Sequence, residues 1–318
     1  MSRSVLSLRL PAYLQTKLIR NGYHTIADLD ESSLAEDLSQ FLSQSEARSL
    51  ALVAKAQPSA HSAWSLRQQA LTQRYFSTQL CQLDALLGGS GIRLGCITEI
   101  TGEPGSGQTD LCLRLCLAAR LPAAQGGLGV DSVYIDTVGS FSYCGAARAA
   151  NRLCVPHLGG AAEAERSSRP TTPLATSLLE GIHVFRVYAA HELVALLCSF
   201  DEIASRIAGI GLVVVNTVSW PFLASFASSV ARRQAMHAEL ARVLSLIASK
   251  HKVAVVLVSQ AKSAFGRSSM PSSSMDGDVW ARVSANRLSL QRRASGDVIV
   301  ALSASTMHST GETLITNV

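Results

Sequence analysis

Uninterrupted apolar runs recur along most of the chain and alternate with stretches whose apolar residues follow a helical spacing. The runs are rich in β-branched residues and read CITEIT (96–101), SVYIDT (132–137), IHVFRV (182–187), GLVVVNTV (211–218) and KVAVVLVS (252–259). Strands that are apolar on both faces are typical of a parallel sheet covered by helices on both sides. The pattern therefore predicts an α/β domain with a twisted, mostly parallel sheet.

Other segments depart from this pattern. Residues 287–305, RLSLQRRASGDVIVALSAS, predict a β-hairpin that turns at Gly296-Asp297. Residues 158–177 are polar and contain prolines, which predicts a loose surface insertion. Trp64 and Trp220 lie outside the apolar runs, and we interpret them as packing anchors.

The first 57 residues predict a small all-α domain that precedes the sheet. Residues 10–22, LPAYLQTKLIRNG, predict a helix that ends at Asn21-Gly22. Capping-box patterns at 33–36 and 43–46 predict two further helices. The predicted organisation is a helical N-terminal domain (1–57), a linker that leads into a short helix (58–79) and the α/β domain (80–318).

Composition narrows the class of protein. The 318 residues are 47% hydrophobic, yet no run approaches the roughly 18 consecutive apolar residues of a membrane span. The first residues do not have the pattern of a secretion signal. Seven scattered cysteines without a CxxC pair argue against a disulfide framework. We therefore expect a protein of the cytosol or nucleus with reduced thiols.

The net charge of +5 is unevenly distributed. Residues 1–57 hold six basic and six acidic residues, whereas residues 232–293 hold 11 basic residues against three acidic ones. Such a bias suggests a polyanionic partner. The charge by itself is explained equally well by a basic surface that faces only solvent.

The segment GEPGSGQTD, which follows the first apolar run, carries the most specific chemistry. It matches the phosphate-binding P-loop pattern G-x-x-x-x-G-K-[ST] except that the lysine position is Gln108. A helix is expected from Gln108 to just before Pro122, so that loop N–H groups and the helix N-terminus face a phosphate. The predicted nucleotide-binding residues are Gly102, Glu103, Pro104, Gly105, Ser106, Gly107, Gln108, Thr109 and Asp110, with Thr109 also as a ligand of Mg²⁺.

A second charged position of P-loop enzymes is also neutral here. Such enzymes need an acidic residue at the end of a later strand to hold the metal ion and its water. The run GLVVVNTV offers Asn216 at this place, and an amide attracts a cation far less than a carboxylate does.

Residues 77–115, STQLCQLDALLGGSGIRLGCITEITGEPGSGQTDLCLRL, resemble the RecA-like eukaryotic strand-exchange recombinases, the Rad51 family and its paralogues. The resemblance continues through VYIDTVGSF (133–141), MHAELARVLSLIASKHKVAVVLVSQ (236–260) and WARVSANRL (280–288). Residues 18–29, LIRNGYHTIADL, are similar to the family's N-terminal helical domain. Within the family, residues 64–89 and 125–141 are most similar to the C paralogue.

The resemblance implies a RecA-like P-loop ATPase core with ATP and Mg²⁺ as cofactors and a sensor glutamine at Gln260. The family's general-base glutamate corresponds to Val138, which cannot accept a proton. Gln108, Val138 and Asn216 are thus three neutral residues at positions where the family uses charged ones. Because losing one phosphate-stabilising charge typically costs 10²-fold or more in rate, we assign no catalytic residue and expect weakened nucleotide binding with weak or no ATP hydrolysis.

The resemblance also implies partners. Two loops of the family contact DNA, and the matching segments here contain Arg232 and Arg233 in the first and Lys262 and Arg267 in the second. Cations on mobile loops suit sequence-independent binding of single-stranded DNA. The resemblance further implies the strand-exchange recombinase and other paralogue subunits as partners. It implies a nuclear protein that does not bind a membrane, and it leaves a meiotic role open.

The family's self-assembly motif, an aromatic residue followed three positions later by alanine, is replaced by Phe76-Ser-Thr-Gln79. Glutamine would fit poorly in an alanine-sized pocket, so we expect docking to other subunits rather than homopolymers.

The leading hypothesis is a largely non-hydrolytic accessory factor of homologous-recombination DNA repair. The alternative is an active DNA-dependent ATPase that tolerates Gln108 and receives a cation from a neighbouring subunit. A third hypothesis, a P-loop module such as a small-molecule kinase, predicts no salt-sensitive DNA binding.

Overall fold

The structure is a computed structural model that describes residues 4–7, 10, 12–25, 28, 42–43, 50, 62–154, 167–226, 229–260, 279–306 and 308–315. The chain divides into two compact units, Met1–Thr72 and Gln73–Val318. The boundary falls within the proposed linker 58–79, because residues after Thr72 belong to the second unit.

The first unit contains short helices in its described part. They are η1 (Val5–Ser7), α1 (Ala12–Arg20) and α3 (Ala63–Leu71). Helix α1 confirms the first predicted helix, and the chain turns after it at Gly22, whose φ is +87°. The helices predicted from the patterns at 33–36 and 43–46 fall outside the described residues, apart from Ser43 and the helical, buried Leu50.

The second unit is an α/β domain. Its strands are β1 (Tyr75–Phe76), β2 (Ile92–Arg93), β3 (Ile97–Gly102), β4 (Asp131–Asp136), β5 (Ile182–Arg186), β6 (Ile210–Asn216), β7 (Ala254–Gln260), β8 (Ser284–Arg292), β9 (Val298–Ser305) and β10 (Gly311–Ile315). Its helices are α4 (Cys81–Leu86), α5 (Gln108–Arg120), η4 (Ala123–Gln125), α6 (Tyr143–Cys154), α8 (Pro173–Glu180), α9 (Ala190–Cys198), α10 (Phe200–Arg206), α11 (Trp220–Ser225), α12 (Val230–His251) and α13 (Val279–Val283).

Eight strands form one sheet in the order β10-β9-β8-β3-β7-β6-β4-β5. Neighbours from β8 to β5 are parallel, whereas β9 is antiparallel to both β8 and β10. This arrangement confirms the predicted RecA-like, mostly parallel sheet. The predicted hairpin is also confirmed, and Gly296 in its turn has a φ of +94° that favours glycine.

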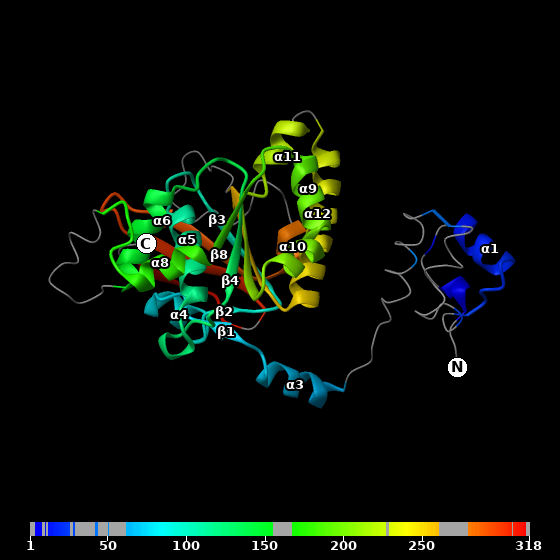
Figure 1. Ribbon diagram of the computed structural model, residues 1–318, viewed down its shortest axis with the longest axis horizontal. Helices are drawn as coiled ribbons and strands as arrows, with labels where there is room; N and C mark the ends of the chain where they lie inside the picture. Colours follow the sequence, from blue (N-terminus) through cyan, green and yellow to red (C-terminus); the bar gives the residue numbers. More distant parts are fainter. Residues whose placement is uncertain are drawn as a thin grey trace. The chain divides into compact units, whose positions relative to one another are not determined.

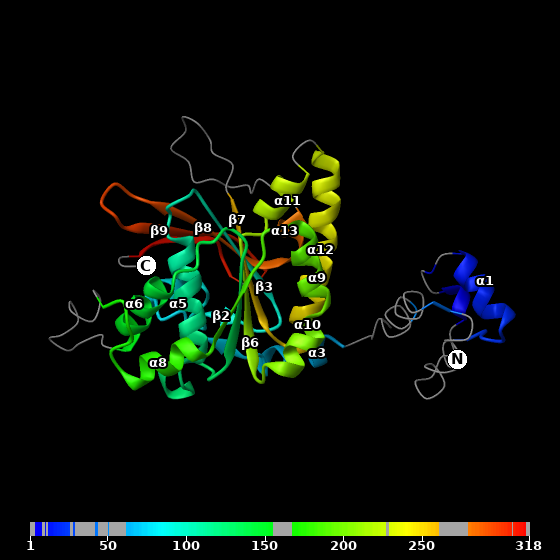
Figure 2. The same ribbon diagram turned by 45° about the horizontal axis from the view of Figure 1, so that its top comes forward.

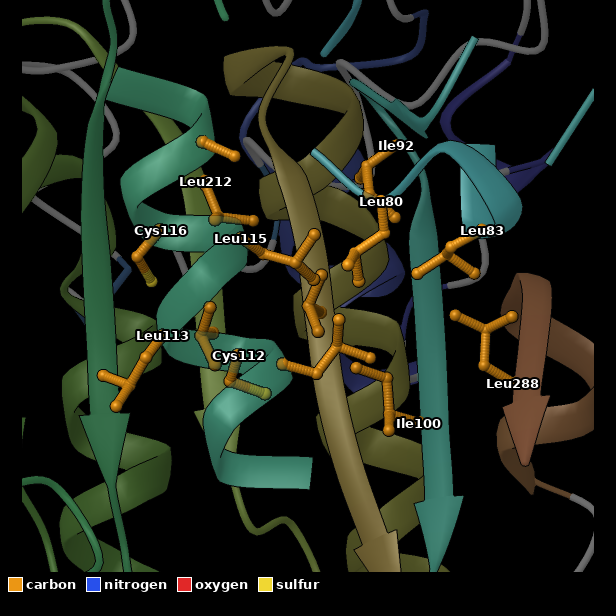
Figure 3. Close-up of a cluster of buried hydrophobic side chains, with 14 of the residues drawn as sticks. Leu80, Leu83, Ile92, Ile100, Cys112, Leu113, Leu115, Cys116, Leu212 and Leu288 are labelled. Atoms are coloured by element: carbon orange, nitrogen blue, oxygen red, sulfur yellow. The ribbon is translucent and has the colours of Figure 1, made fainter. Parts of the chain in front are cut away.

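Both faces of the sheet are covered, which explains the uninterrupted apolar runs. Along β6, Leu212 and Val214 join one core, and Val213 and Val215 join the other. Helices α5, α6 and α8 lie on the first face, and α9, α11 and α12 lie on the opposite face (Figures 1 and 2). Figure 3 shows side chains of α5, among them Cys112 and Leu115, directed into the first core.

Two sequence interpretations are wrong. Residues 158–177 are not a loose insertion throughout, because α8 begins at Pro173 with a Thr172 side-chain cap and buries Leu178. Trp64 and Trp220 are not packing anchors, because the described part of the structure leaves them 62% and 48% exposed. Phe76, the aromatic residue of the segment that replaces the self-assembly motif, is 1% exposed and belongs to the domain's own core.

Candidate nucleotide-binding site

Four parallel strands end at the same edge of the sheet, and their register brings the predicted site residues together. Gly102 at the end of β3 pairs with Gln260 at the end of β7. Asp136 at the end of β4 pairs with Asn216 at the end of β6. The P-loop, the turn after β4, Asn216 and Gln260 therefore meet at the carboxyl edge, where open α/β sheets bind ligands.

The loop between β3 and α5 has the backbone of an anion-binding turn. Gly105 and Gly107 have φ values of +84° and +92°, which suit only glycine without strain. At Gly102, a Cβ would lie 2.4 Å from Ser106 Oγ and 2.9 Å from the Leu290 carbonyl oxygen, so a larger residue would displace the loop. Helix α5 begins directly after Gly107, which directs its N-terminal N–H groups toward the loop.

A cavity of about 420 Å³ opens beside this loop. It is lined by Pro104, Gly105, Gln108, Thr109, Val138, Asn216, Thr217, Trp220 and Gln260. Seven of these were predicted from the sequence, and Thr217 and Trp220 were not assigned to the site. Among the described lining residues none is ionisable, so the cavity's own side chains bring no charge to a phosphate. Gly102, Glu103, Ser106, Gly107 and Asp110 belong to the loop or the first turn of α5 but do not line the cavity.

Gln108 takes the place of the P-loop lysine, and its amide is bonded to the protein main chain. Its Nε2 donates to the carbonyl oxygen of Gly102 at 3.2 Å and to that of Ser259 at 3.5 Å. The side chain thereby connects the ends of β3 and β7. A side chain held in this way offers neither a charge nor a free donor to the cavity.

Asn216 lies at the centre of a cluster of hydroxyl groups and is 2% exposed. Its Nδ2 lies 3.1 Å from Thr109 Oγ1, 2.8 Å from Tyr134 Oη and 3.1 Å from Ser140 Oγ. Burial raises the pKa of Tyr134 far above its usual value, so this phenol stays protonated and neutral. The cluster has no net charge in either orientation of the Asn216 amide.

The turn after β4 carries Val138, whose side chain is 40% exposed and lines the cavity. The carboxylate of the buried Asp136 holds the turn in place. It accepts bonds from the N–H groups of Val138 at 3.3 Å, Ser140 at 3.0 Å and Phe141 at 3.0 Å. Asp136 is therefore committed to the backbone, while the position facing the cavity is an isopropyl group.

Arg292 contacts the loop from outside the cavity lining. Arg292 Nε donates to the carbonyl oxygen of Gly105 at 2.7 Å. This residue was not predicted, because no motif contains it. The pairing of Gly102 with Leu290 places the end of β8 beside the loop, and only that register reveals the contact.

The residues present do not fit a protein-bound divalent cation. Such ions prefer several oxygen ligands with carboxylates among them, and here Thr109 Oγ1 faces the neutral amide of Asn216. Within the described part of the chain, no group of three or more His, Cys, Asp or Glu side chains is arranged to hold a metal ion.

The predicted DNA-contacting residues are only partly described. Arg232 and Arg233 lie in the first turn of α12 and both contact Phe226. The guanidinium of Arg232 lies 4.8 Å from the ring centre of Phe226, and Arg233 Nη1 donates to the Phe226 carbonyl oxygen at 2.7 Å. Lys262 and Arg267 lie outside the described residues.

Comparisons with known proteins agree with this architecture. The model of the Rad51 family matches residues 67–158 and 172–316. DNA repair protein RAD51 homolog 3 of Cricetulus griseus is 28% identical over 281 residues, which cover 82% of this chain and 75% of that protein. The protein of the same name from Dictyostelium discoideum is 31% identical over 184 residues, 56% of this chain and 46% of that protein. None of the helices built from described residues has the length and apolar character that crossing a membrane requires.

Proposed function

The chain belongs to the Rad51 family, and from that premise we propose that it is a recombination paralogue that acts by binding and hydrolyses ATP slowly or not at all. It holds a nucleotide on the loop 102–109 and supports recombinase filaments on single-stranded DNA during homologous-recombination repair. Its partners are the strand-exchange recombinase and other paralogue subunits. It acts in the nucleus, and its role extends to meiotic recombination. The similarity to proteins named RAD51 homolog 3 supports this assignment.

The single observation that carries the proposal is the neutrality of the cavity. Phosphoryl transfer depends on charges that neutralise the transferring phosphate and on a base or oriented water. In place of these groups the cavity is lined by Gln108, Val138 and Asn216. The amides of Gln108 and Asn216 are hydrogen-bonded to other protein atoms. Loop N–H groups and the N-terminus of α5 remain to bind phosphate.

The basic start of α12 supports a DNA contact. Arg232 is exposed and stacks on Phe226, which positions a cation next to the segment that precedes the helix. A cation that contacts the phosphate backbone binds single-stranded DNA without sequence preference. The affinity of such binding falls steeply as the salt concentration rises.

Filament assembly on single-stranded DNA tests the proposal. The full chain should stabilise recombinase filaments equally well with ATP and with a non-hydrolysable analogue. Gly105→Val should lower the effect, because a side chain is strained at the positive φ of this position and would distort the loop that binds the nucleotide. An effect that requires ATP hydrolysis by this chain would contradict the proposal.

A matched pair of variants tests the DNA contact. Arg232→Ala should weaken single-stranded DNA binding and reduce its salt dependence by about one counterion. Arg148→Ala removes an equal charge from α6, on the opposite face of the sheet, and should leave DNA binding unchanged. Equal effects of both variants would show that only the overall charge matters.

One observation favours the second candidate, a DNA-dependent ATPase. Arg292 brings a positive charge to Gly105, and charge at a P-loop can come from outside the lysine position. This candidate predicts multiple turnovers by the isolated chain with DNA, abolished by Thr109→Ala.

A further inference from the structure

The nucleotide site differs from a magnesium-dependent P-loop at the place where the metal ion would be held. In such sites the Ser or Thr hydroxyl of the loop and a carboxylate at the end of a neighbouring strand act on the same ion. Here the strand β6 ends in Asn216, and its Nδ2 lies 3.1 Å from the hydroxyl oxygen of Thr109. The oxygen that would contact the ion is thus paired with a neutral amide.

The surroundings of Asn216 hold it in this role. Besides Thr109, the hydroxyl groups of Tyr134 and Ser140 lie 2.8 Å and 3.1 Å from its Nδ2. The residue is 2% exposed, so moving its side chain toward the cavity would leave buried hydroxyl groups without a partner. The amide is therefore part of the domain's internal hydrogen bonding.

Among the described residues, no carboxylate that faces the cavity can substitute. Asp136 is fully buried, and its two oxygens accept from the N–H groups of Val138, Ser140 and Phe141. Among the described residues that line the cavity, none carries a carboxylate. Adding a divalent cation would gain little attraction from the protein and would cost the ion part of its water shell.

We propose that this site binds its nucleotide independently of magnesium, through the N–H groups of the loop 102–109 and the N-terminus of α5. The proposal rests on the nucleotide binding proposed above. It means that the chain does not distinguish ATP with a bound divalent ion from ATP without one. It also means that cellular magnesium does not set the occupancy of the site.

Equilibrium binding of ATP and ADP to the full chain tests the proposal. Dissociation constants are measured by calorimetry with excess magnesium and with EDTA, at equal ionic strength. For the wild type, the two values should agree within about threefold, less than 1 kcal/mol. A wild-type affinity that falls tenfold or more in EDTA overturns the proposal.

Two variants at one position provide the matched control. Asn216→Asp supplies the missing carboxylate beside Thr109, and it should bind ATP at least about tenfold more tightly with magnesium than with EDTA. Asn216→Ala disturbs the same cluster without adding charge and should show no preference for magnesium. A magnesium preference in Asn216→Ala equal to that of Asn216→Asp overturns the proposal.

The outcomes remain distinguishable from failure of the proposed function. Tight binding that requires magnesium overturns the inference and leaves nucleotide binding intact. Absence of binding under both conditions overturns both. If Asn216→Asp does not fold, Thr109→Val replaces it. That variant lacks the hydroxyl, and its ratio of the two dissociation constants should equal that of the wild type, whereas a changed ratio overturns the inference.

Discussion

The amide nitrogen of Asn216 lies 3.1 Å from the hydroxyl oxygen of Thr109, which joins the end of β6 to the first turn of α5. These two residues are separated by 107 positions in sequence. In a hydrolytic P-loop this contact would involve charge and a metal ion, whereas here it is an ordinary hydrogen bond between neutral groups. The described residues thus combine a P-loop backbone with a cavity lining that carries no charged side chain.

The hydroxyl cluster around Asn216 should behave cooperatively. An amide has two N–H groups, so removing one of three hydroxyl partners leaves enough acceptors. Tyr134→Phe and Ser140→Ala should each cost about 1 kcal/mol or less in the free energy of unfolding. The double variant leaves one buried N–H without an acceptor and should exceed the sum by roughly 1–2 kcal/mol. Denaturant unfolding measures this coupling, and additive costs would contradict the account.

A buried ion pair in the centre of the sheet should be important for stability. Arg287 Nε donates to Glu99 Oε2 at 2.6 Å, and Ser259 Oγ donates to Glu99 Oε1 at 2.6 Å. Because Glu99 is fully buried, Arg287→Met leaves the Glu99 carboxylate without its charged partner. This variant should lower the free energy of unfolding by about 3–5 kcal/mol.

The control for this prediction removes both charges. The double variant Glu99→Leu/Arg287→Met should be more stable than Arg287→Met alone, because no unpaired charge remains. Thermal and urea unfolding of both proteins gives the comparison. If the double variant were less stable than Arg287→Met, the unpaired charge of Glu99 would not be the cause of the lost stability, and the prediction would be wrong.

Arg292 should strengthen phosphate binding modestly. It is exposed and contacts the loop at Gly105, so its effect is screened by water. Arg292→Ala should weaken ATP binding by at most about fivefold, equivalent to 1 kcal/mol. The neighbouring Arg293→Ala is the control and should change affinity less. An equal loss from both variants would mean that Arg292 acts only through net charge.

Two buried thiols should make stability depend on alkaline pH. Burial raises the pKa of Cys116 to about 12, and burial also raises the pKa of Cys112 well above its usual value. A raised folded-state pKa gives stability that is complete below the unfolded value, near 9, and is lost as pH rises toward the folded value. Each thiol should contribute a slope of up to about 1.4 kcal/mol per pH unit.

Alkylation and unfolding measurements check this prediction. At pH 8 the exposed Cys81, Cys144 and Cys198 should react quickly, while Cys112 and Cys116 react only after unfolding. Above pH 9 the variant Cys112→Ala/Cys116→Ala should lose stability less steeply than the wild type. Rapid labelling of Cys116 in the folded protein would contradict its burial.

Much of the fold could be predicted from the sequence because the central strands are apolar on both faces. The observed bounds of β3, β4, β6 and β7 lie within two residues of the predicted runs. Strand β10 was missed, since GETLI at the sheet edge is mostly exposed and has no apolar run. Helix α8 was misjudged because polar and proline residues at 167–173 obscured its start.

The site was predictable where a motif fixes spacing along the chain. The P-loop follows from its motif and Asn216 from the end of an apolar run, whereas Val138 and Gln260 follow only from the resemblance to the Rad51 family. The structure brings members of all four to one cavity. Contacts that depend on strand register were not predictable. Tyr134 lies on β4 beside the strand that ends in Asn216, and nothing in the local sequence indicates that pairing.

Release of phosphate under single-turnover conditions tests the central claim most directly. The wild type is compared with Gln108→Lys/Val138→Glu/Asn216→Asp, and Thr109→Ala reports contaminating activity. The wild type should release phosphate at the rate of Thr109→Ala and at least about 10²-fold more slowly than the restored variant. Magnesium-dependent phosphate release by the wild type as fast as by the restored variant would contradict the central claim.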